Sequence, residues 1–385
     1  MLKNLVFLLI LGAVSLNTQS QNVTFSPQTK VSILTCAPGA ALYASFGHTS
    51  IRVVDPVKGI DWVYNYGIFN FNTPNFYVKF ARGMLKYMVL YYPTDKFLYE
   101  YRGGKREVIE QQLNLTPAEK TRFLEILKDN YNDENKRYYM YDFFYNNCAT
   151  QIRDILKREF NPTYPTPKKD STFRDMLDVY IADQPWLDLG IDLILGLPAD
   201  KKTDVLSQMF LPYYLYYNMS EWKKPNGEPL LGKPTHLVKG INTIDRPDPG
   251  FNQPLYMFWA LFGIALASTF LIKSNRLKRV LDGFFLLITG FIGIFLLLMW
   301  FGTDHDATQR NLNSLWANPL YFYLAFAVWR NRRIKFTFGM MLMVTSLLLA
   351  SWSFFPQKFH YSLIPIFLLM IVRSIDHLFL SKRLH

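Results

Sequence analysis

The chain has 385 residues, half of them hydrophobic, and a formal net charge of +12. This length predicts at least two structural units. Much of the positive charge lies in short loops between apolar segments, at 273–279, 330–335 and 381–385. Positive charge in such loops orients membrane helices. The charge pattern therefore indicates a membrane protein and argues against a nucleic-acid partner.

Residues 1–20 have the pattern of a secretory signal peptide. A lysine precedes an apolar stretch from Leu5 to Val14, and small and polar residues follow it. Such a segment is removed on export, and we expect cleavage after about residue 20. A retained membrane anchor is the alternative. Under either interpretation, residues 21–250 are expected outside the cytoplasm.

The exported part begins with strand patterns and continues with helices. Four segments bounded by turn residues predict strands: VSILTCAPG, HTSIRVVDP, DWVYNYGIF and KREVIEQQLNL. Thr116, Pro117 and Glu119 predict a capped helix start. A second helix is predicted from Cys148, with its apolar residues on one face. After residue 165 the pattern becomes helical and rich in loops, and PWLDLGIDLILGLPAD is apolar enough to lie on a membrane or against membrane helices.

Five apolar segments in the last third of the chain predict membrane helices, each near the ~20 residues that a span requires. An exported N-terminal domain places the three basic loops and the C-terminus inside, as the positive-inside rule requires. Within the last segment Arg373 and Asp376 are three residues apart and are expected to pair. The segments lie near 254–272, 280–302, 315–330, 336–355 and 360–380.

Cys148 is one of only two cysteines in the chain and opens a predicted helix. The partial positive charge at a helix N-terminus stabilises a thiolate. Asn146 and Asn147 directly before it can cap the helix and offer hydrogen-bond donors. Three roles remain open for Cys148: one half of a disulfide with Cys36 in an oxidising compartment, an inert buried thiol, or a nucleophile.

A cysteine nucleophile requires a nearby base, and only two histidines lie in the exported domain. His236 lies in a loop rich in Pro and Gly and is expected at the surface. His48 follows a glycine at the start of a predicted strand, where a structural role is also common. The next strand carries Asp61, Tyr64 and Asn65 as candidates to orient the imidazole, and we favour Asn65.

No metal-ligand cluster and no Gly-rich phosphate loop is apparent, so the sequence predicts no metal and no cofactor. The loop TDHDATQ places His305 between two aspartates, which is a weak metal signal without a distant partner. This loop is expected outside, close to the membrane. Binding of a lipid headgroup or an amine there and an ordinary turn are equally compatible with its sequence.

These residues resemble a known family. FGHTSIRV, YNYG and NNCAT place a histidine, a polar residue and a cysteine in the order found in permuted papain-like enzymes related to the NlpC peptidases. More closely, the segments LTCAPGAALYASFGHTSIRV, YNYGIFNF, FFYNNCAT, TFRDML and LWANPL resemble the Lnb-type lipoprotein N-acyltransferases. The resemblance extends over nearly the whole mature chain.

The resemblance implies an α+β permuted papain-like (NlpC-like) domain followed by an all-α multi-span membrane domain. The expected units are a signal peptide (1–20), a thiol acyltransferase domain (21–165), a helical and loop extension (166–250) and a membrane domain of about five helices (251–385). The expected location is the inner membrane, with the N-terminal domain in the periplasm and the C-terminus in the cytoplasm.

The implied reaction moves an acyl chain from a membrane phospholipid, through a thioester on a cysteine, to the α-amino group of diacylated lipoproteins. Its implied residues are Cys148, His48 and Asn65 as catalytic groups, Asn146, Asn147 and Tyr64 at the oxyanion or substrate, and Cys36 and His305 as accessory groups. Phe143, Phe144 and Tyr145 are candidate walls of an acyl-chain groove. The alternatives are an NlpC-like peptidoglycan endopeptidase or amidase, and a non-enzymatic, disulfide-bonded membrane assembly protein.

Overall fold

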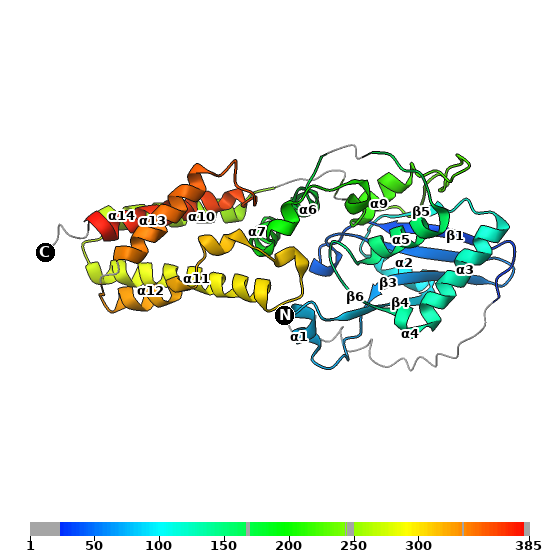
Figure 1. Ribbon diagram of the computed structural model, residues 1–385, viewed down its shortest axis with the longest axis horizontal. Helices are drawn as coiled ribbons and strands as arrows, with labels where there is room; N and C mark the ends of the chain where they lie inside the picture. Colours follow the sequence, from blue (N-terminus) through cyan, green and yellow to red (C-terminus); the bar gives the residue numbers. More distant parts are fainter. Residues whose placement is uncertain (1–23, 167–169, 243, 245–249, 333–334, 381–385) are drawn as a thin grey trace.

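The computed structural model describes residues 24–166, 170–242, 244, 250–332 and 335–380. The predicted signal peptide lies outside the described residues. The molecule is elongated, with a sheet domain at one end and a bundle of long helices at the other (Figure 1). The C-terminus lies at the free end of the bundle.

The sheet is antiparallel throughout and has seven strands in the order β6-β4-β3-β2-β1-β5-β7. All four predicted strands are present, as β1, β2, β3 and β5. The strands β4, β6 and β7 were not predicted from the sequence. The bounds are β1 (Lys30–Cys36), β2 (His48–Asp55), β3 (Ile60–Ile68), β4 (Lys86–Pro93), β5 (Val108–Gln112), β6 (Tyr138–Met140) and β7 (Thr235–Val238).

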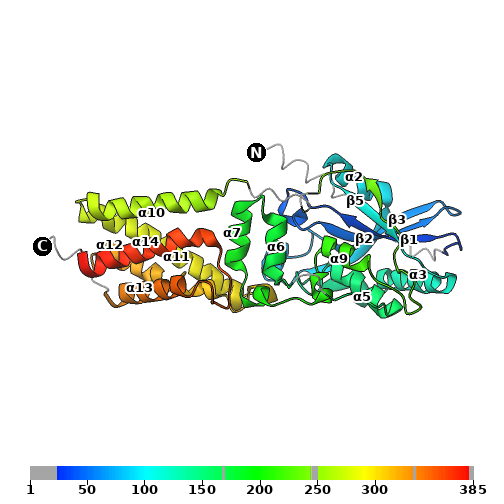
Figure 2. The same ribbon diagram turned by 90° about the horizontal axis from the view of Figure 1, so that it is seen from above.

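Helices cover both faces of this sheet (Figure 2). On one face, α3 (Pro117–Asn132) and α5 (Cys148–Phe160) pack over the main hydrophobic core, and the short α4 (Glu134–Arg137) lies between them in sequence. The other face is covered by α2 (Thr94–Gly103), which buries a smaller cluster. A further short helix, α1 (Phe76–Ala81), lies beside the sheet at the end nearest the bundle (Figure 1).

The two predicted helix starts in this domain are confirmed. The Thr116 side chain accepts a hydrogen bond from the Glu119 backbone N–H and Glu119 returns one, which completes a capping box at the start of α3. Cys148 is the first residue of α5, and Asn147 is its N-cap. In α5 the residues predicted to share the apolar face, Ile152 among them, are buried against the sheet.

The segment between the sheet domain and the bundle, from α6 (Phe173–Ile181) to β7, contacts both of them. Its other helices are α7 (Pro185–Ile194), α8 (Val205–Gln208) and α9 (Pro212–Met219). Its strand β7 pairs with β5 and extends the sheet. As expected from its apolar sequence, α7 packs against the bundle, where Trp186 contacts Phe258 of α10 edge-to-face. The segment therefore joins the two parts through packed contacts.

The bundle has a helix at each of the five predicted positions. They are α10 (Gln253–Leu271), α11 (Asn275–Phe301), α12 (Leu320–Trp329), α13 (Lys335–Ala350) and α14 (Ile364–Ile375). Among the described residues, 253–271, 275–301 and 361–380 are long and apolar enough to cross a membrane. The helices α12 and α13 are shorter, so that a count of five complete spans stays a prediction.

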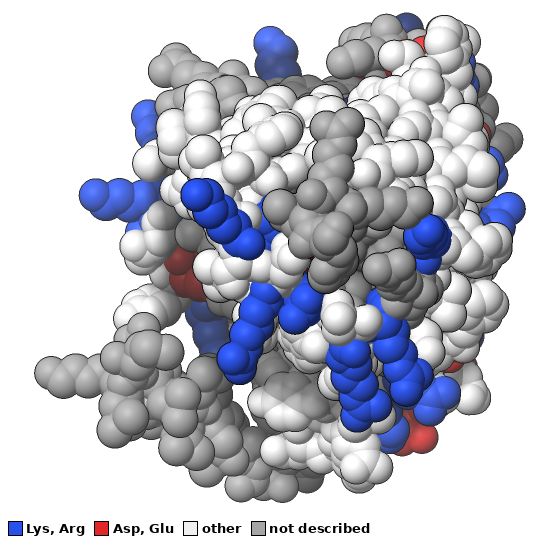
Figure 3. All heavy atoms as spheres, turned by 90° about the vertical axis from the view of Figure 1, so that its left-hand side faces the viewer, with Lys and Arg blue, Asp and Glu red and all other residues white. Residues whose placement is uncertain are grey.

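A buried ionic network ties the bundle together near its free end. Arg373 of α14 donates to both carboxylate oxygens of Asp282 in α11 at 2.6 and 2.7 Å, and to the Thr269 hydroxyl in α10 at 2.6 Å. It also pairs with Asp376 at 2.9 Å, which confirms the predicted pair. The free end itself carries many Lys and Arg side chains and few acidic ones (Figure 3).

Candidate active site

The candidate site lies at the end of the sheet that faces the bundle. There β1 ends at Cys36 and β2 begins at His48, and these two residues are directly paired. Ala307, in the loop after α11, belongs to the same hydrophobic cluster as Ala37 and Phe46 beside this edge. The first residues of β2 therefore lie at the end of the sheet that faces the membrane domain.

His48, Asn65 and Tyr92 form a hydrogen-bonded row across three neighbouring strands. The Nε2 atom of His48 lies 2.7 Å from Oδ1 of the buried Asn65, and Nδ2 of Asn65 donates to the Tyr92 hydroxyl at 2.6 Å. Because Asn65 is held by Tyr92, its oxygen faces His48 and accepts the Nε2 proton. The other ring nitrogen, Nδ1, then remains for Cys148, and atoms of both side chains lie within 4 Å of a Cβ atom built on Gly67.

Cys148 is positioned by the cap of α5. Oδ1 of Asn147 accepts from the backbone N–H groups of Ala149 and Thr150 at 2.8 and 3.0 Å, and this cap fixes the start of the helix. The thiol is partly exposed. The cap therefore fixes the Cys148 side chain at the start of α5.

These contacts favour a charged pair. Burial by itself would raise the pKa of the Cys148 thiol, but the charge of His48, its hydrogen bond and two backbone N–H groups outweigh burial and lower that pKa below its usual value. Burial opposes the charged form of His48 as well, and the Cys148 thiolate and the bonds to Cys148 and Asn65 outweigh it, so the His48 pKa is raised. The pair therefore favours thiolate and imidazolium.

Gly67 keeps the space between the two groups open. A β-bulge between Tyr66 and Ile68 places Gly67 at φ +99°, in the left-handed region. A Cβ atom built there would lie 3.7 Å from the Cys148 Cβ and 3.8 Å from the His48 Cε1. The segment YNYG pointed to its polar residue, and the role of Gly67 was not predicted, since a bulge leaves no reliable pattern in a single sequence.

Gly47 sets the backbone in front of His48. It has φ +74°, and a Cβ atom there would lie 2.6 Å from the Cys36 carbonyl oxygen. We expect Gly47→Ala to lower the free energy of unfolding by about 2–3 kcal/mol, from left-handed strain plus this clash. Gly59→Ala is the matched control, with φ +64° and no atom within 4 Å, and it is expected to cost about 1 kcal/mol. If denaturant unfolding showed the same loss of unfolding free energy for Gly47→Ala and Gly59→Ala, the clash with the Cys36 carbonyl would have no role.

The other candidates from the strand after His48 lie away from the thiol. Asp61 forms an ion pair with Arg52 at 2.6 Å, in the half of β3 remote from His48. Tyr64 projects to the opposite face from Asn65, where its ring packs 5.2 Å from that of Tyr91 in the main core. Of the three candidates to orient the imidazole, the structure brings only Asn65 to His48.

The side-chain amides of the two asparagines before Cys148 are hydrogen-bonded to backbone carbonyls. Nδ2 of Asn146 donates to the Met140 carbonyl at 2.7 Å. Nδ2 of Asn147 donates to the carbonyls of Phe143 and Phe210 at 2.7 and 3.0 Å. Both amides shape the approach to the helix. Because each Nδ2 group already donates to a backbone carbonyl, neither is a spare donor for the Cys148 sulfur.

Cys36 is buried and is not bonded to Cys148, because both cysteines are free thiols in the structure. Burial raises the pKa of Cys36 to about 12, although a hydrogen bond with Tyr101 opposes the shift. Cys36 therefore stays protonated at neutral pH. Its place beside His48 is that of a small core residue.

His305 lies in a loop that reaches from the membrane domain to the sheet domain. The backbone N–H of Asp304 donates to the Arg82 carbonyl at 2.8 Å, and His305 packs over Gly83. Its charge also acts on Asp142, in the turn that leads to Cys148. His236 is half exposed and lies 3.1 Å from Glu107, in agreement with its expected surface position.

The structure also assembles a group that the sequence did not reveal. Asp188, Asp192 and His360 place one ligand atom each within 4.8 Å of one another, although His360 is far from both in sequence. His360 lies 3.2 Å from Asp188, and the guanidinium of Arg174 donates to Asp192 at 2.7 Å. Arg174 thus supplies the positive charge that a bound cation would supply, and we interpret the group as part of an ionic joint between α6, α7 and the bundle.

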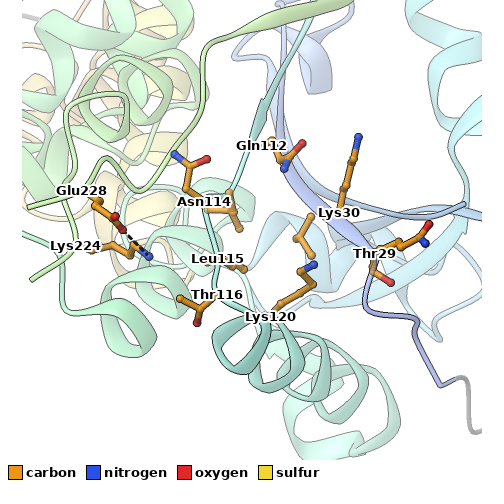
Figure 4. Close-up of a pocket in the computed structure, with 12 residues that line it drawn as sticks. Thr29, Lys30, Gln112, Asn114, Leu115, Thr116, Lys120, Lys224 and Glu228 are labelled. Atoms are coloured by element: carbon orange, nitrogen blue, oxygen red, sulfur yellow. Dashed lines mark ion pairs between the residues drawn. The ribbon is translucent and has the colours of Figure 1, made fainter. Parts of the chain in front are cut away.

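A separate pocket opens at the opposite end of β1 (Figure 4). It has polar walls, with Lys30 and Lys120 among its residues, and Lys224 pairs with Glu228 at 3.6 Å at its side. Lys30 begins β1, whereas Cys36 at the candidate site ends it. The pocket is therefore separated from Cys148 by the length of the strand.

Two models of protein families match the chain. The Lnb N-terminal periplasmic domain matches residues 17–179, and the Lnb transmembrane domain matches residues 246–384. No curated protein and no solved structure shows a significant match. The fold and these matches define a membrane protein with a periplasmic N-terminal domain. The chain has the two-domain architecture of the Lnb-type lipoprotein N-acyltransferases, which confirms the resemblance of its motifs.

Proposed function

We propose that the protein is a lipoprotein N-acyltransferase, with Cys148 as the acyl carrier, His48 as the proton carrier and Asn65 as the residue that orients His48. The observation that carries the proposal is that the Cys148 and His48 side chains come together beside Gly67, while Nε2 of His48 is held 2.7 Å from Asn65. Covalent acyl transfer requires a nucleophile next to a base, and a third group that orients the base.

In the first half-reaction the Cys148 thiolate attacks the carbonyl carbon of a phospholipid ester. The backbone N–H of Cys148, at the N-terminus of α5, supports the developing oxyanion, because the first N–H groups of a helix have no acceptor within it. The C–O bond breaks, and the lysophospholipid leaves with the proton that His48 returns. The product is a thioester on Cys148.

In the second half-reaction the free α-amino group of a diacylglyceryl-cysteine lipoprotein attacks this thioester. His48 accepts a proton from the amine, the C–S bond breaks and the thiolate is restored. The lipoprotein leaves as an N-acylated, triacylated product. No metal or cofactor takes part in either step.

The proposed setting is the inner membrane, with the sheet domain in the periplasm and the C-terminus in the cytoplasm. The Lys and Arg side chains at the free end of the bundle support this orientation (Figure 3). Both substrates are anchored in the outer leaflet of that membrane. The candidate site faces the same side, at the end of the sheet next to the bundle.

Complementation tests this function. The chain is expressed in a strain without lipoprotein N-acyltransferase, and the N-termini of its lipoproteins are examined by mass spectrometry. We expect one added acyl chain. Unchanged lipoproteins together with newly cleaved muropeptides would favour the NlpC-like endopeptidase or amidase, which uses the same nucleophile.

The pH dependence of acyl transfer follows from the two pKa shifts. The ion pair exists above the lowered pKa of Cys148 and below the raised pKa of His48, so a bell-shaped profile of kcat/KM is expected. The bond to Asn65 raises the His48 pKa. In Asn65→Ala the alkaline limb is therefore expected to move to lower pH. An alkaline limb that stays in place would show that Asn65 does not act through His48.

A further inference from the structure

The segment 69–84 exposes apolar side chains on the sheet domain, next to the bundle. Tyr77 is 80% exposed, and Val78 and Phe80 are 58% and 52% exposed. Phe71 and Met84 extend the same surface. Exposed apolar residues that are contiguous in this way mark a binding surface, because single scattered ones are ordinary.

The charge of this segment fits an anionic surface. Lys79, Arg82 and Lys86 lie among the apolar residues, and the chain has no Asp or Glu from 62 to 94. Aromatic rings with flanking basic residues are typical of segments at the level of lipid headgroups. Anionic headgroups attract each Lys or Arg near the surface by about 1 kcal/mol.

The segment is fixed at the end of a membrane helix. The Asp304 N–H donates to the Arg82 carbonyl at 2.8 Å, and Asp304 is the third residue after the end of α11 at Phe301. Because α11 has 27 residues and is apolar enough to cross a membrane, its end marks the outer surface of the membrane. Figure 1 shows α1 beside this end of the bundle.

A row of rings connects this surface with Cys148. Phe69 packs edge-to-face on Tyr87 with centroids 5.2 Å apart, and Tyr87 stacks on Tyr141 at 4.3 Å. Tyr139 packs against the same small cluster as Tyr141, and it also packs against the main core, as Cys148 does. Phe144, by contrast, is buried in the core between Phe173 and Phe210, and does not form the predicted groove wall.

We propose that residues 69–84 form an interfacial anchor, which inserts its aromatic side chains into the outer leaflet and brings that leaflet to the row of rings beside Cys148. The partner is the lipid bilayer, for two reasons: the surface continues the outer end of α11, and its charge complements anionic headgroups. The anchor deepens the proposed function, since acyl chains would reach the thiol along this surface.

The test uses the full-length chain with Cys148→Ala, in vesicles of phosphatidylcholine and phosphatidylglycerol. Tyr77→Cys, labelled with an environment-sensitive nitrobenzoxadiazole, reports insertion. Tyr99→Cys is the matched control, because Tyr99 is also 80% exposed and belongs to α2, a helix that lies farther from the bundle than α1 (Figure 1). The remaining Cys36 has no exposed surface and should not take up the label.

Spin-labelled lipids with the quencher within the acyl region are expected to quench the probe at position 77 at least twofold more than the probe at position 99. A blue-shifted emission at 77 is expected with it. Equal quenching at the two positions would overturn the anchor. The assay requires no acyl transfer, so a failure of the proposed function alone leaves this result unchanged. Phe80→Cys gives an independent reading of the same surface.

Discussion

Cys148→Ala is expected to reduce acyl transfer by at least ~10⁴-fold, the loss that follows removal of the nucleophile from a covalent mechanism. The change removes the only group that the proposal allows to carry the acyl chain. Because Ala is compatible with the first turn of a helix and Asn147 still caps it, the fold should persist. Acylation of a synthetic diacylated lipopeptide in detergent, followed by mass spectrometry, measures the effect.

Cys36→Ala is the matched control for this variant. Cys36 is the second cysteine and lies beside His48 in the sheet, but its raised pKa keeps it protonated and unreactive at neutral pH. We expect this variant to retain most of the transfer. If the two variants lost activity equally, or if Cys148→Ala remained active, the assignment of the nucleophile would be wrong.

The second large effect is expected for Arg174→Met. The Arg174 side chain is fully buried and pairs with Asp192 at 2.7 Å and Asp200 at 2.9 Å. It also donates to the Leu195 carbonyl at 3.2 Å, and Gln357 from the loop before α14 donates to the same carbonyl. Removing one partner leaves two buried carboxylates uncompensated, so we expect a loss of about 3–5 kcal/mol in the free energy of unfolding.

For Arg174→Met this loss corresponds to a fall in Tm of at least ~6 °C in detergent. Arg102→Met is the control, since Arg102 and its partner Asp95 are 53% and 90% exposed and pair at 3.2 Å. An exposed pair contributes about 0–1 kcal/mol, so its Tm should hardly change. A similarly small shift for Arg174→Met would show that the joint between α6, α7 and the bundle does not depend on this ion pair.

Local patterns in the sequence predicted much of the fold. Strands with buried alternation, such as β2, and caps such as Thr116 and Asn147 depend on neighbouring residues, so a single sequence carries them. The strand β4 was missed because its Tyr-rich sequence, KYMVLYYP, does not alternate cleanly between apolar and polar. The strand β7 was missed because it is short and pairs with β5 from more than 100 residues away.

The three main residues of the candidate site could also be predicted from local patterns in the sequence. His48, Asn65 and Cys148 each lie at a recognisable place, at a strand start, on the next strand and at a helix start. The contact that holds Asn65 in place is long-range and has no such signal, because it comes from Tyr92 on another strand. The Asp188, Asp192 and His360 group depends likewise on the packing of α7 against the loop before α14.

The most direct measurement of the central claim is mass spectrometry of the peptide that contains Cys148, after incubation of the full chain with a phospholipid of known acyl chains and no lipoprotein. We expect the mass of this peptide to increase by one acyl group on Cys148. Hydroxylamine should remove that acyl group, and an added diacylated lipopeptide should accept it. An unmodified Cys148 in a preparation that still acylates the lipopeptide would contradict the proposed mechanism.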